Sequence, residues 1–167
     1  FLNLGMYEQA GKVGESLVNA LKNSVPFEAL YSFVFIEKVG KALTNVPKPY
    51  LERPDLDIAV PMSVETVGRG KHIYIPVEVN CITKNYIFDT GCSFGNFVSE
   101  KYAKEAGLKI VADSIPVSGM EIGFVRLATA DSMKIGELVY HNPIFMVAPP
   151  DNELDSVFTF DGVLGYN

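Results

Sequence analysis

Hydrophobic and polar residues alternate with two different periods along this chain. Near its beginning, apolar residues recur every three or four positions, at Tyr7, Ala10, Val13, Leu17 and Leu21. This spacing places them on one face of an α-helix. A second apolar stretch runs to about Leu43. We expect Ser24 to cap this second helix, with Pro26 in its first turn.

After a segment that contains Pro47, Pro49, Pro54 and Pro61, apolar residues recur at every second position. Alternating residues predict strands, and Gly68-Arg69-Gly70 and Gly136-Glu137 predict two of the turns between them. One helix is expected at 98–106, ended by Gly107. The predicted strands are 62–67, 73–79, 86–88, 110–117, 123–130, 132–135 and 138–147.

Hairpins with a single helix favour a closed antiparallel β fold over a sheet built from parallel βαβ units. We therefore expect a mainly β lobe at 62–167, preceded by a Pro-rich linker at 47–61 and an α-helical hairpin at 1–46. A pair of helices needs neighbours to bury both of its faces. We expect further helices before residue 1 for this reason.

Composition excludes several classes of function. The chain has 14 basic and 20 acidic residues, a net charge of −6 and a pI near 4.9. Without a Lys/Arg cluster, it is a poor binder of nucleic acid or anionic lipid. The apolar stretches are too short to span a membrane. Two cysteines, Cys81 and Cys92, and two histidines, His72 and His141, do not make a zinc site, and we expect no metal.

The candidate chemistry lies in the segment Phe88-Asp89-Thr90-Gly91-Cys92-Ser93. An acid directly after a hydrophobic strand is costly to bury unless it is hydrogen-bonded or functional. The Thr90 and Ser93 hydroxyls and the N–H groups of the turn can hold such a carboxylate. Gly91, without a Cβ, lets its backbone approach a partner closely.

This segment resembles the active-site loop of the aspartic proteases, hydrophobic-hydrophobic-Asp-Thr/Ser-Gly-X-Ser. The segment Asp161-Gly162-Val163-Leu164-Gly165 resembles the strand that passes beside the catalytic loop in the retroviral-type (retropepsin-like) members. The Gly-rich stretch between them lies where that family has its flap. Its candidate flap residues are Gly119, Met120, Glu121, Ile122 and Gly123. The resemblance covers residues 71–167 and implies an aspartic-protease-like β-barrel lobe.

The resemblance implies an endopeptidase in which two Asp carboxylates share a proton and activate water for attack on a peptide bond. Asp89 would be one of them. Thr90 would join the two loops, and Ser93 would bond the outer carboxylate oxygen. No cofactor is required. The sequence has one Asp-Thr-Gly, so the second Asp would come from a homodimer partner or from a second lobe beyond residue 167.

Further features follow from the same resemblance. The substrate would be a polypeptide bound in extended form. Bacterial aspartyl proteases with a helical, tetratricopeptide-like N-terminal part are similar, and Leu4-Gly5-Met6-Tyr7 resembles part of such a repeat. That group implies a periplasmic or secreted location. We assign Asp161 a turn-capping role, and Cys92, which replaces a residue that is often Ala, the role of a small buried thiol.

Two alternatives stay open at this stage. Gly91-Cys92-Ser93-Phe94-Gly95 matches the G-x-S-x-G elbow of serine hydrolases, and Asp113 or Asp131 followed by His141 would complete the order Ser, Asp, His. That fold, however, needs a largely parallel sheet. The other alternative is an inert binding or scaffold module that keeps the protease fold, in which Asp89 only caps a turn.

Overall fold

The computed structural model describes residues 1–67, 70–92, 95–118, 122–149 and 161–165. The chain forms two compact units. We call Phe1–Lys48 with Ile110–Leu127 the helical unit, and Pro49–Lys109 with Ala128–Asn167 the sheet unit. The hairpin predicted to carry the flap thus groups with the N-terminal helices. The domain limits expected from the sequence stay a prediction.

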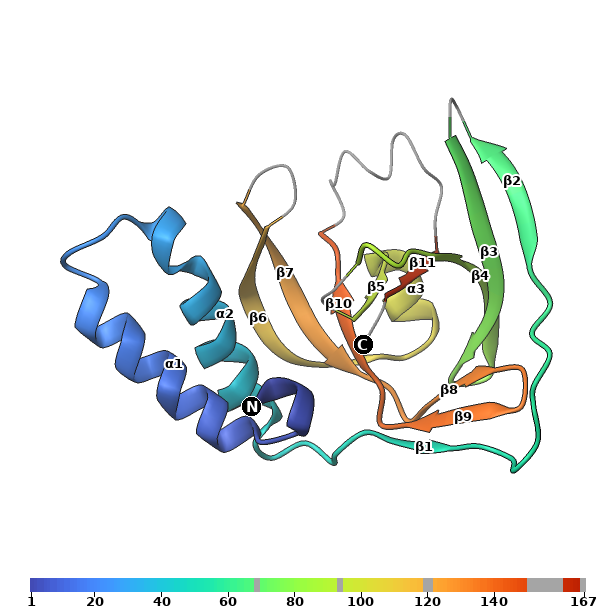
Figure 1. Ribbon diagram of the computed structural model, residues 1–167, viewed down its shortest axis with the longest axis horizontal. Coiled ribbons are helices and arrows are strands. Elements are labelled where there is room, and N and C mark those ends of the chain that lie inside the picture. Colours follow the sequence, from blue (N-terminus) through green and yellow to red (C-terminus); the bar gives the residue numbers. More distant parts are fainter. Residues whose placement is uncertain (68–69, 93–94, 119–121, 150–160, 166–167) are drawn as a thin grey trace. The chain divides into compact units, whose positions relative to one another are not determined.

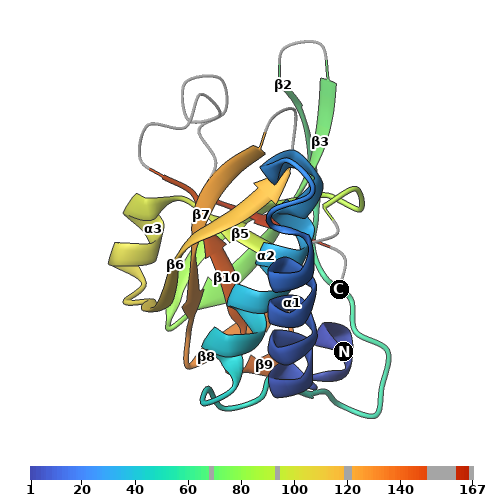
Figure 2. The same cartoon turned by 90° about the vertical axis from the view of Figure 1, so that its left-hand side faces the viewer.

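Two antiparallel helices dominate the helical unit (Figure 2). A short 3-10 helix, η1 (Leu2–Leu4), precedes α1 (Tyr7–Leu21) and α2 (Phe27–Leu43), so both predicted helices are present. The cap differs from our expectation. Pro26 is the N-cap of α2 and makes no side-chain capping bond, because Ser24 lies in the preceding turn, where its N–H donates to the Leu21 carbonyl.

The helical unit also contains most of a β-hairpin, formed by β6 (Lys109–Ser118) and β7 (Ile122–Thr129). Helix α2 contacts both strands. Lys38 Nζ donates to the Ser114 carbonyl at 2.7 Å, and the Phe27 ring stacks on Phe124 with 6.2 Å between centroids. These contacts explain why α2 has apolar residues on most of its surface: it packs against α1 and also meets the hairpin.

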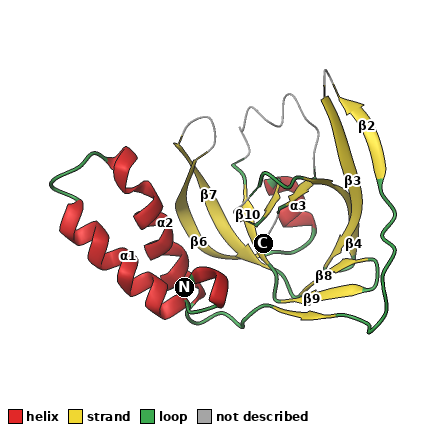
Figure 3. Ribbon diagram, in the orientation of Figure 1, coloured by secondary structure: helices red, strands yellow, loops and turns green. Residues whose placement is uncertain are grey.

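The sheet unit is mainly β, as predicted (Figures 1 and 3). Its strands are ordered β1-β9-β8-β3-β4-β11-β5-β10, and β2 pairs with the first half of β3 outside this order. The one helix, α3 (Glu100–Glu105), starts at the N-cap Ser99, whose Oγ accepts the Tyr102 N–H. The strands are β1 (Tyr50–Glu52), β2 (Ser63–Val67), β3 (Gly70–Val79), β4 (Ile82–Phe88), β5 (Asn96–Val98), β8 (Ser132–Ile135), β9 (Leu138–His141), β10 (Ile144–Val147) and β11 (Gly162–Leu164).

Most of these pairs are antiparallel, but β10 with β5 and β11 with β4 are parallel. The sheet is therefore mixed where antiparallel pairing alone was expected. The single strand predicted at 138–147 is two strands, because Asn142 has φ 53° and Pro143 has no N–H to donate. The hairpin turn at Gly136-Glu137 is present, with Ile135 opposite Leu138.

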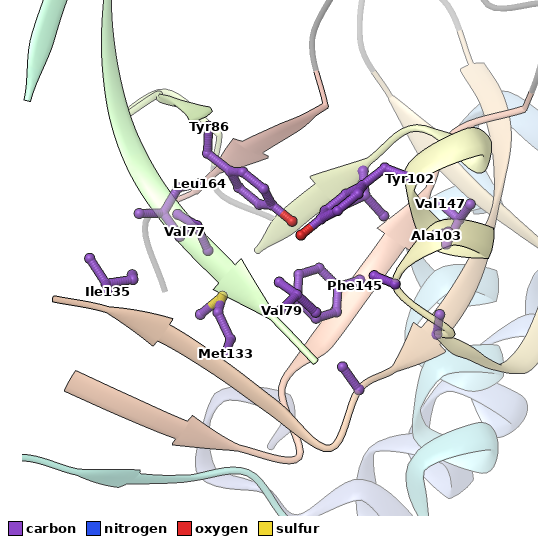
Figure 4. Packing of buried hydrophobic residues seen from close by; sticks show 14 of the residues in the cluster. Val77, Val79, Tyr86, Tyr102, Ala103, Met133, Ile135, Phe145, Val147 and Leu164 are labelled. Atoms are coloured by element: carbon purple, nitrogen blue, oxygen red, sulfur yellow. The ribbon is translucent and has the colours of Figure 1, made fainter. Parts of the chain in front are cut away.

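The core of the sheet unit is built from the apolar residues at every second position of β3. Ile75, Val77 and Val79 are buried, while the residues between them are half-buried. They pack with Tyr86, Tyr102, Phe145 and Leu164, as Figure 4 shows. Tyr86 lies on β4 just before the candidate catalytic loop, and Leu164 lies on β11 beside the loop. The loop therefore rests directly on this core.

Candidate active site

Asp89 lies directly after the last residue of β4. Its backbone N–H donates to the Leu164 carbonyl of β11 at 3.1 Å, which continues the parallel pairing of Leu164 with Phe88. Pairing of the loop stops there, because the chain turns at Thr90 and Gly91. The backbone of Asp89 is thus held by a strand that comes from the far end of the chain.

The turn after Asp89 is closed by its own carboxylate. The Gly91 N–H donates to Asp89 Oδ1 at 2.8 Å, and the Cys92 N–H donates to the Asp89 carbonyl at 3.2 Å. This is the Asx-type turn that Asp favours. A Cβ on Gly91 would lie 3.1 Å from Asp89 Oδ1, closer than ordinary contact, so a side chain there would press on the carboxylate. The arrangement orients the carboxylate and leaves most of it open to other partners.

The loop is exposed in this chain. Asp89 and Thr90 are exposed, and Phe88 is 37% exposed. The Asp89 carboxylate is therefore not buried in the single chain. Ser93 lies outside the described residues. Cys92 is half-buried, and its Sγ lies 3.4 Å from the Gly95 carbonyl.

Strand β11 fills the space between two strands next to the loop. Val163 is opposite Ile87 in the parallel pair with β4 and opposite Phe97 in the antiparallel pair with β5. Gly165 follows at the loop itself, where a Cβ would overlap the carbonyl oxygens of Cys92 and Gly95. The structure thus brings the two segments quoted from the sequence, 88–92 and 161–165, into contact.

Charged groups surround the start of β11. Asp161 accepts the Ser99 N–H through its carbonyl at 3.2 Å, and its carboxylate lies 3.8 Å from Lys84 Nζ. Lys84 also lies 3.4 Å from Glu105 and 5.9 Å from the centre of the Tyr102 ring. Asp161 therefore ties β11 to β4 and α3. Sequence analysis did not single out Lys84, because these partners come together only in the fold.

Other candidate residues lie apart from this loop or outside the description. Gly119, Met120 and Glu121 are not among the described residues, and Ile122 and Gly123 begin β7. His141, the histidine of the serine-hydrolase alternative, is on β9, which β8 and β3 separate from β4 in the sheet. Its Nε2 lies 3.0 Å from Glu52, and its ring stacks on Tyr50. With a mainly antiparallel sheet, the structure disfavours that alternative.

Within the described residues, no group of three His, Cys, Asp or Glu side chains is placed to hold a metal ion. None of the described helices is both long and apolar enough to cross a membrane.

The family model for aspartyl proteases matches residues 75–167, and no curated protein sequence matches the chain. Among solved structures, a retropepsin-like aspartic protease from Rickettsia conorii is similar, with 20% identity, a TM-score of 0.42 and coverage of 68% of this chain and 81% of that one. The retroviral protease-like domain of Ddi1 from Leishmania major is 12% identical, with a TM-score of 0.37 and coverage of 55% and 70%. Since the family model covers more than half of the residues, this chain belongs to the aspartyl protease family.

Proposed function

We propose that the protein is an aspartic endopeptidase in which Asp89 supplies one carboxylate of a catalytic pair. The observation that carries this proposal is the joint anchoring of Asp89: Leu164 holds its backbone and the Gly91 N–H holds one carboxylate oxygen. The loop is thus oriented and also exposed. A second carboxylate facing it would share a proton with it, because two adjacent carboxylates do not both ionise.

The reaction would need no group beyond the two acids and water. The ionised carboxylate takes a proton from water, and the protonated one polarises the peptide carbonyl, so that the water oxygen attacks the carbonyl carbon. The second carboxylate comes from another copy of the chain or from a further lobe. Thr90, exposed beside Asp89, and Ser93 are proposed to join and orient the two loops. The substrate is proposed to be an extended polypeptide that pairs as an added strand.

The test is cleavage of an unfolded protein by the full chain from about pH 3 to 8, the range over which a carboxylate pair titrates. Asp89→Asn is expected to fold normally and lose at least about 10³-fold in kcat, because the amide does not act as a base. Asp57→Asn, at an exposed linker position, is the matched control with the same change of charge. Full activity in Asp89→Asn would refute the proposal.

Two other outcomes identify the alternatives. If Ser93→Ala abolishes turnover and Asp89→Asn keeps it, the serine-hydrolase alternative is correct. If the folded protein cleaves nothing at any pH over a wide concentration range, either alone or together with a further lobe that supplies a second Asp, the inert binding module is favoured.

A further inference from the structure

The buried ring of Tyr86 occupies the place of a side chain on Gly162. Tyr86 is on β4, three residues before Asp89, and is 0% exposed. Gly162 is its register partner on β11. A Cβ on Gly162 would lie 2.5 Å from both Cε2 and Cζ of that ring, a distance that real Cβ atoms do not adopt. With the ring in this place, only glycine fits at position 162.

The ring is held in place by the core and cannot swing aside easily. Tyr86 packs edge-on against Tyr102, with ring centres 5.9 Å apart and planes at 82°. Tyr102 is itself fixed, since its hydroxyl donates to the Ile82 carbonyl at 2.9 Å. Figure 4 shows Leu164 on the other side of Tyr86. Close packing on these sides makes the ring a rigid surface for β11.

The position of β11 in turn determines the position of Asp89. Leu164, whose carbonyl accepts the Asp89 N–H at 3.1 Å, is two residues after Gly162 in a strand of only three residues, Gly162–Leu164. A shift of Gly162 away from the ring would therefore move this carbonyl as well. We propose that Tyr86 is a positioning residue for Asp89, acting through its ring, Gly162 and the Leu164 carbonyl. The catalytic meaning of this inference rests on the proposed function.

The ring, and not the hydroxyl, carries this role. The Tyr86 hydroxyl is buried and points toward the Tyr102 hydroxyl, as Figure 4 shows, whereas ring carbons make the contact with Gly162. The ring carbons that block Gly162 are also present in phenylalanine, whereas leucine lacks the planar ring. Tyr86→Phe removes the hydroxyl and keeps the ring, whereas Tyr86→Leu removes both. Comparison of the two variants therefore isolates the effect of the ring.

The experiment compares three variants of the full chain. One carries Gly162→Ala alone, and the other two combine it with Tyr86→Leu or with Tyr86→Phe. The alanine Cβ must retreat by about 1 Å to reach ordinary contact, and a displacement of that size can lower kcat about 10²-fold, here with KM unchanged. We expect Tyr86→Leu to restore kcat by about tenfold in the Gly162→Ala background and Tyr86→Phe to restore none.

Amide hydrogen exchange gives a readout that needs no activity. In Gly162→Ala, the Asp89 N–H should exchange about tenfold faster or more, while the core amide of Val77 keeps its protection. A loss of global stability would accelerate both. The inference would be overturned by an unchanged exchange rate of the Asp89 N–H in Gly162→Ala. It would also be overturned if Tyr86→Leu and Tyr86→Phe had the same effect on kcat in the Gly162→Ala background. If the wild-type chain cleaves nothing, kcat offers no comparison, and the exchange comparison alone decides the positioning role.

Discussion

At the scale of single residues, Asn80 joins three segments of the sheet unit through one side-chain amide. Its Oδ1 accepts the Asp131 and Ser132 N–H groups at 3.0 and 3.2 Å, and its Nδ2 donates to the Ala106 carbonyl at 2.9 Å. Its φ of 47° is one that Asn tolerates better than most residues. The β3–β4 turn, the end of α3 and the start of β8 therefore share one anchor.

We expect Asn80→Ala to lower the free energy of unfolding by about 2–4 kcal/mol, since each lost bond contributes about 1 kcal/mol and alanine is strained at positive φ. Urea unfolding followed by circular dichroism measures this. Asn85→Ala, at an exposed position of β4, is the control and should change little. Equal effects of the two substitutions would show that the three bonds contribute nothing.

Tyr86 also makes a pH-dependent prediction. Burial raises the pKa of Tyr86 above its ordinary value of 10.0. The unfolded chain then loses the phenol proton before the folded chain does, so this contribution is complete below about pH 10 and is lost as the pH rises further. Replacement by Phe removes the titrating group. Between about pH 10 and 11.5, Tyr86→Phe should lose less stability than the wild type in urea titrations; parallel curves would contradict this.

At the scale of elements, glycines set the distance between α1 and α2. A Cβ on Gly14 would lie 2.5 Å from the Glu37 backbone nitrogen, and one on Gly40 would overlap the Gly11 backbone. Neither neighbour is a flexible side chain that can move away. Two helices can approach this closely only where both lack side chains at the crossing.

Two effects oppose each other in Gly14→Ala. Alanine favours a helix by about 1 kcal/mol over glycine, and overpacking costs about 1–3 kcal/mol. Because the clash is with backbone, we expect overpacking to dominate and the helices to melt earlier in thermal circular dichroism. Ser32→Ala, at an exposed position of α2, should instead raise the melting temperature slightly. Stabilisation by both substitutions would refute the close approach.

At the scale of the whole molecule, the proposed mechanism requires a second carboxylate beside Asp89. If another copy of the chain supplies it, turnover per chain should rise with chain concentration. Mixing wild type with an excess of Asp89→Asn chains should then lower the activity of the wild-type chains more than tenfold at about tenfold excess, because mixed pairs lack one acid. Turnover per wild-type chain that is independent of concentration and of added variant would exclude a pair of copies as the active form.

The local part of this architecture could be predicted from the sequence. Helices α1 and α2, most strands and the Gly136-Glu137 turn follow from apolar periodicity and turn chemistry within a few residues. The motif around Asp89 also indicated the family that the model for residues 75–167 confirms. Two predictions were wrong because of local backbone geometry: Ser24 lies in the turn before α2 and does not cap it, and the strand expected at 138–147 divides at Asn142.

The elements and the acidic loop can be recognised from the amino-acid sequence, because apolar periodicity and the Asp-Thr-Gly motif involve residues that are close together in the chain. Three features come from the three-dimensional fold: β11 lies between β4 and β5, the Leu164 carbonyl holds the Asp89 N–H, and the Tyr86 ring leaves room only for glycine at position 162. A strand of three residues is too short to show an alternation of apolar and polar residues. Its partner strands are therefore determined by packing and by backbone hydrogen bonds between distant segments.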